Sequence, residues 1–323
     1  MNILVTGASG FIGSHLCAAL LSQGHSVRGA VRKRGLPPAL LTSAVDWIEL
    51  ADLDRPEPLE SACKDIDVVI HLAAFVHQMR GDAESKEYDR VNHQGTLNLA
   101  RAAISSGVRR FVFLSSIKVN GEERESPYCL DDIANPVGAY AISKYAAEQG
   151  LRKLEQDLAL DVVIIRPPLV YGTGVKANFL ALVSLVKRGV PLPLATLNNQ
   201  RSLVSIFNLV SLISHCLSHS AACQGVLFVC DGEAISTPEL IQRIATAYGV
   251  RSRLLSCPVA LLRFLGKLSG RSTSVNRLIG SLSIDMSETC QRLNWQPPVT
   301  MQYTLEKMCA ESSLSIAKEH RVK

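Results

Sequence analysis

A tyrosine and a lysine four residues apart are the side chains of this sequence with the clearest chemistry. Tyr140 and Lys144 lie in the string Tyr-Ala-Ile-Ser-Lys, within a segment of strong helix formers over 138–157. Residues i and i+4 share one face of a helix, so the ammonium is expected beside the phenol. A free tyrosine has a pKa of about 10, and a neighbouring cation lowers that pKa. The pair therefore predicts an acid/base that exchanges a proton with a reacting oxygen.

A serine just beyond a predicted strand complements this pair. Ser116 follows the apolar run 111–115, in the string Leu-Ser-Ser-Ile-Lys-Val-Asn-Gly. Ligands of open α/β sheets bind at the carboxyl ends of the strands, so we expect its hydroxyl to hydrogen-bond the same reacting oxygen. A Tyr-x-x-x-Lys string alone occurs by chance in many helices. Together with this serine and a glycine string upstream, it is far more specific.

The glycine string stands where the phosphates of a dinucleotide would bind. Gly-Ala-Ser-Gly-Phe-Ile-Gly, at 7–13, follows the first apolar run and opens the first helical segment. The first glycine permits a tight turn, the second lets the backbone approach a diphosphate, and the third lets helix and strand pack closely. Free N–H groups at the helix start meet the negative charge. The predicted phosphate-binding residues are Gly7, Gly10, Phe11, Ile12 and Gly13.

The residues after the second predicted strand favour a phosphorylated cofactor. A chain that binds NAD usually places Asp or Glu about 20 residues after the glycines, where it accepts the ribose 2′-hydroxyl. Here the strand over 26–31 is followed by Arg32, Lys33 and Arg34, and the next acid is Asp46. Three cations suit a 2′-phosphate dianion. We predict NADP(H) in preference to NAD(H), which remains possible; the alternative is that the cations only solvate a loop.

Further cofactor contacts are expected at the ends of other strands. The two residues after the third strand are placed to meet the adenine, and small residues end the fourth strand where the nicotinamide ribose would pass. The predicted contacts are Asp52, Leu53, Leu72, Ala73, Ala74 and Pro167, together with Tyr140 and Lys144.

Alternating strands and helices must position these groups. The expected strands are 3–6, 26–31, 47–50, 68–72, 111–115 and 162–166, and helical segments such as 14–23, 88–106 and 138–157 separate them. This alternation predicts an α/β fold with a doubly wound parallel sheet of the Rossmann type. Beyond the last strand, prolines interrupt shorter helices. We therefore expect a dinucleotide-binding domain over 1–166 and a smaller substrate-binding cap over 167–323, interleaved with the sheet.

Composition excludes several classes of protein. Of 323 residues, 47% are hydrophobic and 20% charged, which excludes a disordered or fibrous chain. A net charge of +5 is too small and too thinly spread to indicate nucleic-acid binding. No run reaches the roughly 18 apolar residues of a membrane span, and the first residues lack the pattern of a secretory signal. The nine cysteines include no CxxC pair, so we predict reduced thiols, a cytoplasmic location and no metal site.

One stretch of the second half carries charge of a single sign. No Asp or Glu occurs from Leu240 to Ile284. The basic residues there are Arg243, Arg251, Arg253, Arg263, Lys267, Arg271 and Arg277. A solvated face is the simplest explanation. The alternatives are a positive field that attracts an anionic ligand and a peripheral membrane patch.

The glycine string, the strand-end serine and Tyr-x-x-x-Lys, in this order, resemble the extended short-chain dehydrogenase/reductase family, in its branch of nucleotide-sugar epimerases, dehydratases and reductases. The resemblance covers nearly the whole chain. It implies that Tyr140 is the catalytic acid/base, that Lys144 binds the nicotinamide ribose and tunes Tyr140, and that Ser116 orients the substrate. It also implies that Asn92, in Val-Asn-His-Gln-Gly, supports the active site through its backbone.

The same resemblance implies a UDP-sugar substrate and a homodimer. Family members hold a nucleoside diphosphate with residues that match Asn178, in Lys-Ala-Asn-Phe-Leu, and Arg201, in Arg-Ser-Leu-Val-Ser-Ile. Arg277 is a weaker candidate for the same diphosphate. Dimers of the family commonly form through the helices that include the Tyr-x-x-x-Lys segment.

The choice of reaction follows from a few positions. Dehydratases of this branch carry Asp-Glu directly after the catalytic hydroxyl residue, where this chain has Ile117 and Lys118, so dehydration is not expected. A 4-epimerase returns its hydride from the same NADH and needs no phosphorylated cofactor. A 4-ketoreductase consumes a hydride in each turnover and would draw on NADPH. The basic cluster after the second predicted strand favours NADPH and therefore favours this reaction.

Three strings, at 115–121, 166–172 and 175–179, are also similar to bacterial 4-reductases that turn UDP-4-keto-6-deoxy-N-acetylglucosamine into UDP-N-acetylquinovosamine for surface polysaccharide such as O-antigen. We therefore expect a reductase of that kind. A UDP-hexose 4-epimerase with tightly bound NAD is the alternative. From another class, a catalytically silent NADP-binding sensor or scaffold is a further alternative, against which the intact Ser116, Tyr140 and Lys144 argue.

Overall fold

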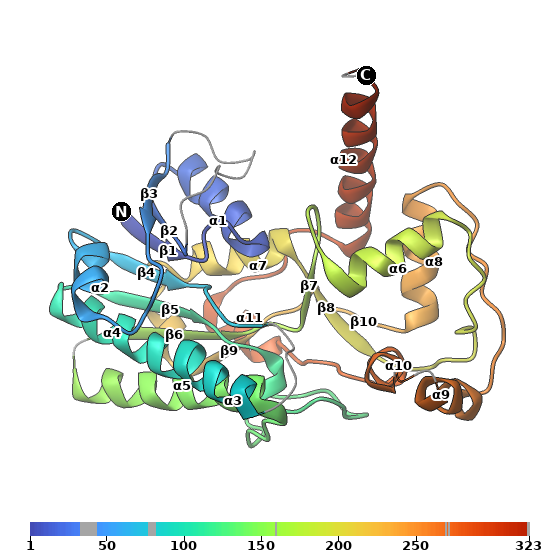
Figure 1. Cartoon of the computed structure of the whole chain (residues 1–323), viewed down its shortest axis with the longest axis horizontal. Helices are drawn as coiled ribbons and strands as arrows, with labels where there is room; N and C mark the ends of the chain where they lie inside the picture. Colours follow the sequence, from blue (N-terminus) through green and yellow to red (C-terminus); the bar gives the residue numbers. More distant parts are fainter. Residues whose placement is uncertain (33–43, 77–81, 159, 269, 271, 322–323) are drawn as a thin grey trace.

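A parallel sheet of seven strands forms the centre of the molecule (Figure 1). The computed structural model describes residues 1–32, 44–76, 82–158, 160–268, 270 and 272–321. In spatial order the strands are β3 (Asp46–Glu49), β2 (Ser26–Val31), β1 (Asn2–Thr6), β4 (Val68–His71), β5 (Arg110–Leu114), β6 (Asp161–Arg166) and β9 (Val226–Phe228). All neighbouring pairs are parallel, so the predicted α/β fold with a parallel Rossmann-like sheet is confirmed.

Helices cover both faces of this sheet (Figure 1). One face carries α1 (Phe11–Ser22) and α7 (Ile206–His215); the other carries α2 (Pro56–Cys63), α4 (Gly95–Ser105) and α5 (Gly138–Asp157). Successive side chains of a strand point to opposite faces, so Ile3 and Val5 pack in the core with α1, whereas Leu4 packs in the core with α2 and α4. Because both faces of the sheet are buried, the sequences of the central strands are unbroken apolar runs.

The segment expected as one helix over 88–106 is divided into three parts. It comprises the end of α3 (Asp82–Tyr88), a π-helical turn over Asp89–Gln94, and α4. A π-helical turn contains an extra residue and is frequent at functional sites. It carries the fully buried Asn92.

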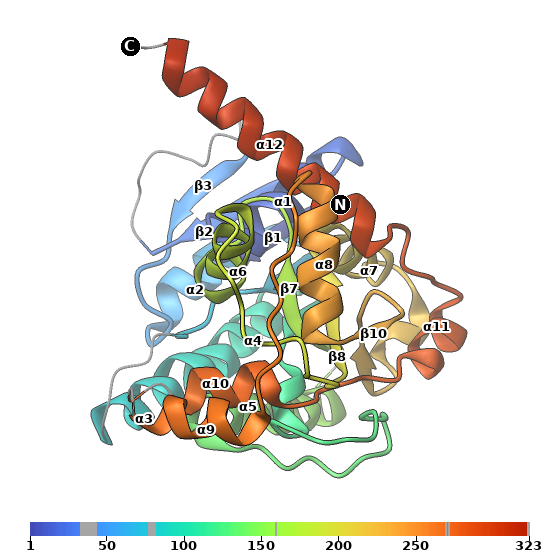
Figure 2. The ribbon, with the colours of Figure 1, turned by 90° about the vertical axis from the view of Figure 1, so that its right-hand side faces the viewer.

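A small second sheet organises the C-terminal part of the chain. Its strands are β7 (Leu169–Tyr171), β8 (Arg201–Ser205) and β10 (Ala234–Ile235), in the order β10-β8-β7. The remaining elements are the helices α6 (Ala177–Lys187), α8 (Thr237–Ala247), α9 (Val259–Leu268), α10 (Ser272–Ile279), α11 (Ser287–Leu293) and α12 (Met301–Arg321), and the 3₁₀ turns Ile117–Val119 and Ser220–Cys223. Helices α9 and α10 lie side by side, and the end of α12 stands away from the body (Figures 1 and 2).

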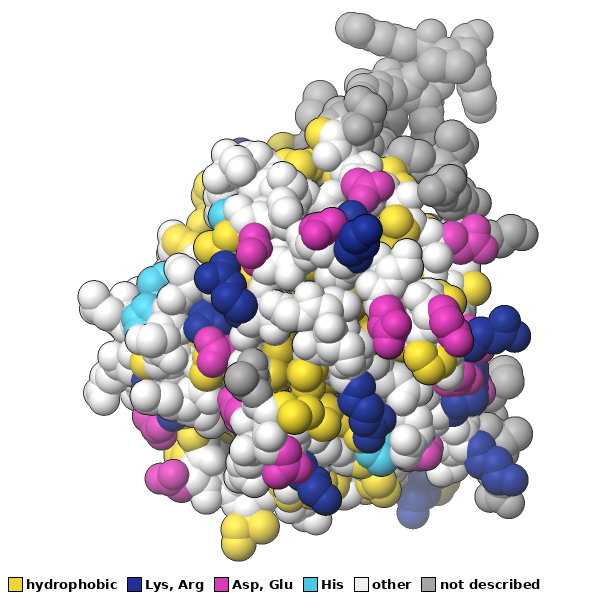
Figure 3. Space-filling view, turned by 90° about the vertical axis from the view of Figure 1, so that its left-hand side faces the viewer, with side chains coloured by type: hydrophobic (Ala, Val, Ile, Leu, Met, Phe, Trp, Pro, Cys, Tyr) yellow, Lys and Arg dark blue, Asp and Glu magenta, His cyan; other side chains and the backbone are white. Residues whose placement is uncertain are grey.

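The surface gives two general indications about partners. On the face that Figure 3 shows, acidic and basic side chains are interspersed rather than gathered by sign. Among the described residues, no helix has the length and apolar character needed to cross a bilayer.

Candidate active site

The carboxyl ends of the central strands meet where the strand order reverses, between β1 and β4. In open α/β sheets this switch point forms the ligand crevice. The glycine string follows β1, Leu72 to Ala74 follow β4, and Ser116 follows β5. The topology therefore brings these three predicted segments to one edge of the sheet.

The glycine string forms a tight turn into α1. Gly7 has a φ of +68°, which favours glycine, and its carbonyl accepts a hydrogen bond from the Gly10 N–H at 2.9 Å. A methyl group on Gly13 would lie 2.7 Å from the Ala8 Cα and closer still to the Gly7 carbonyl oxygen, so only glycine lets α1 approach β1 this closely. Phe11 and the neighbouring Ile12 form the first turn of α1. The open N-terminus of α1 and this cradle fit the diphosphate of a dinucleotide.

The Ser116 hydroxyl lies next to the Tyr140 phenol and favours the charged form of that phenol. Ser116 is held in extended backbone at the start of a 3₁₀ turn, where its Oγ accepts the Lys118 N–H at 3.3 Å. Burial raises the pKa of Tyr140 to about 12, and the Ser116 hydroxyl opposes this effect only in part. The expected lowering of this pKa by Lys144 is therefore wrong for the folded chain. At neutral pH the phenol is protonated, the form that donates a proton.

Lys144 lies one turn further along α5, with only 2% of its surface exposed. Its ammonium donates to the Leu114 carbonyl at 2.9 Å and sits 4.5 Å from the centre of the Phe113 ring. Burial lowers the pKa of Lys144 to about 7, although the Glu148 carboxylate opposes this shift. The ammonium thus binds the end of β5 and titrates close to neutral pH.

Asn92 joins the loop after β4 to the helix that carries Tyr140. Its Oδ1 accepts the Phe75 N–H at 2.7 Å, and its Nδ2 donates to the Phe75 carbonyl at 3.0 Å and to the Ser143 Oγ at 3.2 Å. The Ser143 hydroxyl then donates to the Tyr140 carbonyl at 2.9 Å. The side chain of Asn92 makes these contacts, whereas the resemblance implied a role for its backbone. The Tyr88 ring packs edge-on against Tyr140, with centroids 6.0 Å apart.

A buried histidine that the sequence analysis does not single out connects the same elements. Thr6 Oγ1 accepts the Ala73 N–H at 3.2 Å and donates to His71 Nδ1 at 2.7 Å. His71 Nε2 then donates to Thr96 Oγ1 at 3.1 Å, and that hydroxyl donates to the Asn92 carbonyl at 2.7 Å. These donors and acceptors fit a neutral imidazole protonated at Nε2. Burial lowers the pKa of His71 to about 3.

A buried ion pair lies one further turn along α5. Arg166, at the end of β6, donates from Nε to a Glu148 carboxylate oxygen at 2.9 Å and makes a second, shorter contact with the other oxygen. The Ser115 hydroxyl also donates to Glu148, and Arg166 reaches the Asn120 amide oxygen at 2.9 Å. The sequence analysis missed this cluster as well. It fixes α5 against the ends of β5 and β6.

The other predicted cofactor residues lie around the crevice with varied partners. Arg32 is exposed directly after β2, while Lys33 and Arg34 fall outside the described residues. Asp52 is paired with Arg90, at 3.0 Å between Nη1 and Oδ1, in an exposed cluster. Leu53 packs against the start of α4, where a methyl group on Gly95 would lie 2.9 Å from its Cβ.

The remaining strand-end residues frame the same edge. Leu72 donates its N–H to the Thr6 carbonyl at 3.3 Å, and Ala74 is half-buried two residues further on. Pro167 is buried after β6, and its carbonyl accepts the Ile117 N–H at 3.0 Å. This bond holds the turn that begins at Ser116.

Two of the three residues predicted to hold the diphosphate of the substrate come together. Arg201, at the start of β8, donates from Nη1 to the carbonyls of Arg277 and Gly280, both at 2.8 Å. Arg277 itself is exposed on α10. Asn178 is exposed on a different element, in the first turn of α6.

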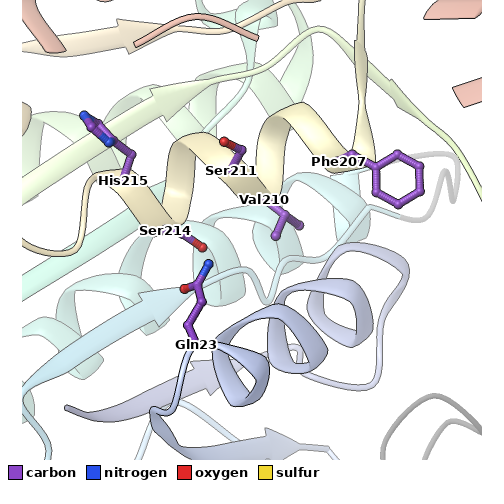
Figure 4. Close-up of a pocket in the computed structure, with 6 residues that line it drawn as sticks. All are labelled: Gln23, Phe207, Val210, Ser211, Ser214 and His215. Carbon is purple, nitrogen blue, oxygen red and sulfur yellow. The ribbon is translucent and has the colours of Figure 1, made fainter. Parts of the chain in front are cut away.

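A groove of about 510 Å³ lies elsewhere, between the end of α1 and α7 (Figure 4). Gln23, Phe207, Val210, Ser211, Ser214 and His215 line it. None of the predicted site residues is among them, so we separate this groove from the crevice at the strand ends.

The parallel sheet, its glycine turn and the tyrosine at the switch point define a dinucleotide-binding oxidoreductase of the Rossmann type. The chain belongs to the NAD dependent epimerase/dehydratase family, whose model matches residues 3–229. The predicted membership of the extended short-chain dehydrogenase/reductases is thereby confirmed.

Relatives and solved structures extend this result. The chain is 42% identical over 308 residues to a UDP-glucose 4-epimerase of Vibrio cholerae, which covers 93% of this chain and 92% of the relative. UDP-glucuronic acid 4-epimerase from Bacillus cereus in complex with NAD matches with a TM-score of 0.77 and 24% identity, over 96% of this chain and 98% of that one. MoeE5 in complex with UDP-glucose and NAD matches with a TM-score of 0.77 and 26% identity, over 98% and 100%. The preferences for NADP(H) and for 4-reduction stay predictions.

Proposed function

We propose that this chain transfers a hydride at C4 of a UDP-sugar, with Tyr140 as the acid/base. The proximity of Tyr140 to Ser116, which follows β5 at the carboxyl edge of the parallel sheet, carries this proposal. The relative from Vibrio cholerae, a UDP-glucose 4-epimerase, supports the substrate class.

In the direction of reduction, the carbonyl oxygen of a keto sugar accepts hydrogen bonds from Ser116 and Tyr140. Tyr140 donates its proton as negative charge develops on that oxygen, and the buried ammonium of Lys144 offsets the charge left on the phenol. The glycine turn would hold the diphosphate of a nicotinamide cofactor, whose chemistry would be hydride transfer. Asn92 and Ser143 keep the backbone of Tyr140 in place through this step.

Within this chemistry we propose 4-ketoreduction with NADPH, for which two features argue. Arg32 is exposed directly after β2, and no acid precedes Asp46 to accept a ribose 2′-hydroxyl. The substrate would be a UDP-4-keto-6-deoxy-N-acetylhexosamine, and the active unit a homodimer through the helices that include the Tyr-x-x-x-Lys segment.

A second candidate is 4-epimerisation of a UDP-hexose with tightly bound NAD. The relative at 42% identity over nearly the whole chain favours it. The two reactions share the proton transfer by Tyr140 and differ in whether the cofactor leaves after each turnover.

One experiment on the purified chain separates these reactions. The protein is denatured and the released nucleotide identified; the native protein is then assayed with a UDP-4-keto-6-deoxy sugar plus NADPH or NADH, and with UDP-glucose. Protein that is free of nucleotide and oxidises NADPH supports the reductase. Stoichiometric NAD with epimerisation of UDP-glucose identifies the epimerase. Tight NADPH binding without turnover of either sugar identifies a silent binding protein.

Substitution of the tyrosine tests the chemistry common to both reactions. Tyr140→Phe should lower kcat by about 10²–10⁴, the contribution of general acid catalysis, with an unchanged circular dichroism spectrum. Turnover within a few-fold of the parent would remove Tyr140 from the reaction and refute the mechanism.

A further inference from the structure

Helix α9 is apolar on two sides. Its inward side packs into the C-terminal core through Val259 and Leu262. Gly266 continues this side, where an added methyl group would lie 2.9 Å from the side chain of Val275 on α10. These contacts hold α9 beside α10 at one end of the molecule (Figure 2).

The outward side carries three large apolar residues. Leu261, Phe264 and Leu268 have 46%, 61% and 77% of their surface exposed. Their spacing of three and four residues places them on one side of the helix, roughly opposite Leu262. Single exposed leucines are common on protein surfaces, but three large apolar side chains in a row on one helix form a patch that usually marks an interaction site.

Cations flank this apolar row. Arg263 and Lys267 are exposed, one turn apart, and neither forms an ion pair within the described part of the chain. Glu123, from the loop after β5, shares a pocket of about 280 Å³ with both cations and offsets part of their charge. Arg277 is exposed on the adjoining helix. Because no acid occurs from residue 240 to 284, the charged side chains that α9 and α10 themselves contribute are all basic.

We propose that the outward side of α9 docks on an anionic lipid surface. Leu261, Phe264 and Leu268 insert at the boundary between headgroups and acyl chains, while Arg263 and Lys267 stay at the level of the phosphates. A leucine- and phenylalanine-rich face flanked by basic residues is the composition of helices that lie in a membrane interface. An anionic surface also complements the charge of this side.

The charge argues against a second copy of this chain as the occupant. In a symmetric dimer, the patch of one copy would contact the same patch of the other copy. The cations of both copies would then lie close together at a contact that excludes water. Docking on lipid would also hold α10, and Arg277 with it, close to the headgroups. The inference does not rest on the proposed reaction, because binding is measured without substrate.

Vesicle sedimentation with the full chain tests the proposal. Vesicles of phosphatidylglycerol with phosphatidylethanolamine should bind the protein at low salt, and vesicles of phosphatidylcholine alone should bind it far more weakly. Each basic residue near an anionic surface contributes about fivefold to affinity, so Arg263→Gln with Lys267→Gln should weaken binding roughly 30-fold. Phe264→Ser with Leu268→Ser should weaken it by an order of magnitude or more.

A matched substitution controls for the loss of any exposed leucine. Leu158, 44% exposed at the end of α5, is the control, and Leu158→Ser should leave vesicle binding unchanged. Circular dichroism establishes that each variant is folded. Equal binding by the parent and the Phe264→Ser, Leu268→Ser variant would overturn the proposal. So would equal binding to both kinds of vesicle, or a dimer in light scattering that this variant dissociates.

Discussion

Protonation of His71 in acid should destabilise the folded chain. The folded pKa of about 3 lies below the value of about 6.5 for an unfolded histidine, so the folded state binds fewer protons between these values. The stability that depends on a neutral His71 is therefore complete above about pH 6.5 and is lost as the pH falls towards 3. The cause is structural, because His71 is fully buried and the charge of Lys144 also disfavours a cationic imidazole.

The size of the effect follows from proton linkage. Between pH 7 and pH 5 the unfolded imidazole gains most of a proton, whereas the buried one stays neutral. Integration over this interval gives a loss of about 2 kcal/mol in the free energy of unfolding. The result hardly changes for any folded pKa below about 4. It is a large part of the roughly 5–15 kcal/mol that stabilises a typical domain.

Urea denaturation at pH 7 and pH 5 measures this loss in three proteins. His71→Gln offers an amide oxygen to Thr6 and an amide N–H to Thr96 but does not titrate, so its loss between the two pH values should be about 2 kcal/mol smaller than that of the parent. His25→Gln is the comparison, because His25 keeps partial access to solvent and its pKa is lowered by less than that of His71; its loss should be much closer to that of the parent than the loss of His71→Gln is. Equal losses in the parent and His71→Gln would refute the reasoning. Each protein is compared with itself at the two pH values. Any loss of unfolding free energy that the substitution causes equally at both pH values therefore cancels.

Three substitutions test the framework of the site. Gly13→Ala forces α1 away from β1 and should weaken dinucleotide binding at least about tenfold in a fluorescence titration; unchanged affinity would contradict the role of the turn. Glu148→Gln leaves the guanidinium of Arg166, 7% exposed, without a carboxylate and should cost about 3–5 kcal/mol of unfolding free energy in urea. Ser143→Ala removes the link between Asn92 and α5 and should lower kcat with KM unchanged; a change in KM alone would count against this positioning role.

The sequence predicted helices and strands well where the spacing of hydrophobic residues and the positions of glycines indicate the same bounds. The strand over 26–31 and the helix over 138–157 begin and end in the structure at the predicted residues. The first helix starts three residues before the predicted position, at Phe11, because Gly10 already serves as its N-cap. The π-helical turn could not be predicted, since an extra residue in a helix leaves hydrophobic spacing almost unchanged. It depends on Asn92, whose partners lie 17 and 51 residues away.

The residues of the candidate site also fall into a group that the sequence predicts and a group that it does not. The glycine turn and the Tyr140–Ser116 pair follow from short motifs that local geometry brings to a strand end. The His71 network joins residues 25 and 65 positions apart, and nothing in the chain marks a histidine at the end of an apolar strand as its centre. The sign of the Tyr140 pKa shift was also wrong, because burial raises this pKa and the Lys144 ammonium binds the Leu114 carbonyl; both are tertiary properties.

Helix α5 shows how the fold holds a reacting phenol in place. Tyr140, Lys144 and Glu148 follow one another at intervals of four residues and face the ends of two neighbouring strands. Tyr140 lies next to Ser116 after β5, Lys144 binds the Leu114 carbonyl of β5, and Glu148 binds Arg166 on β6. A slip of α5 by one residue would turn all three by about 100° and leave a buried ammonium and a buried carboxylate without partners. Such a slip costs several kcal/mol for each unpaired charge. The contacts of Lys144 and Glu148 therefore fix the register of α5, and this register fixes the position of the Tyr140 phenol.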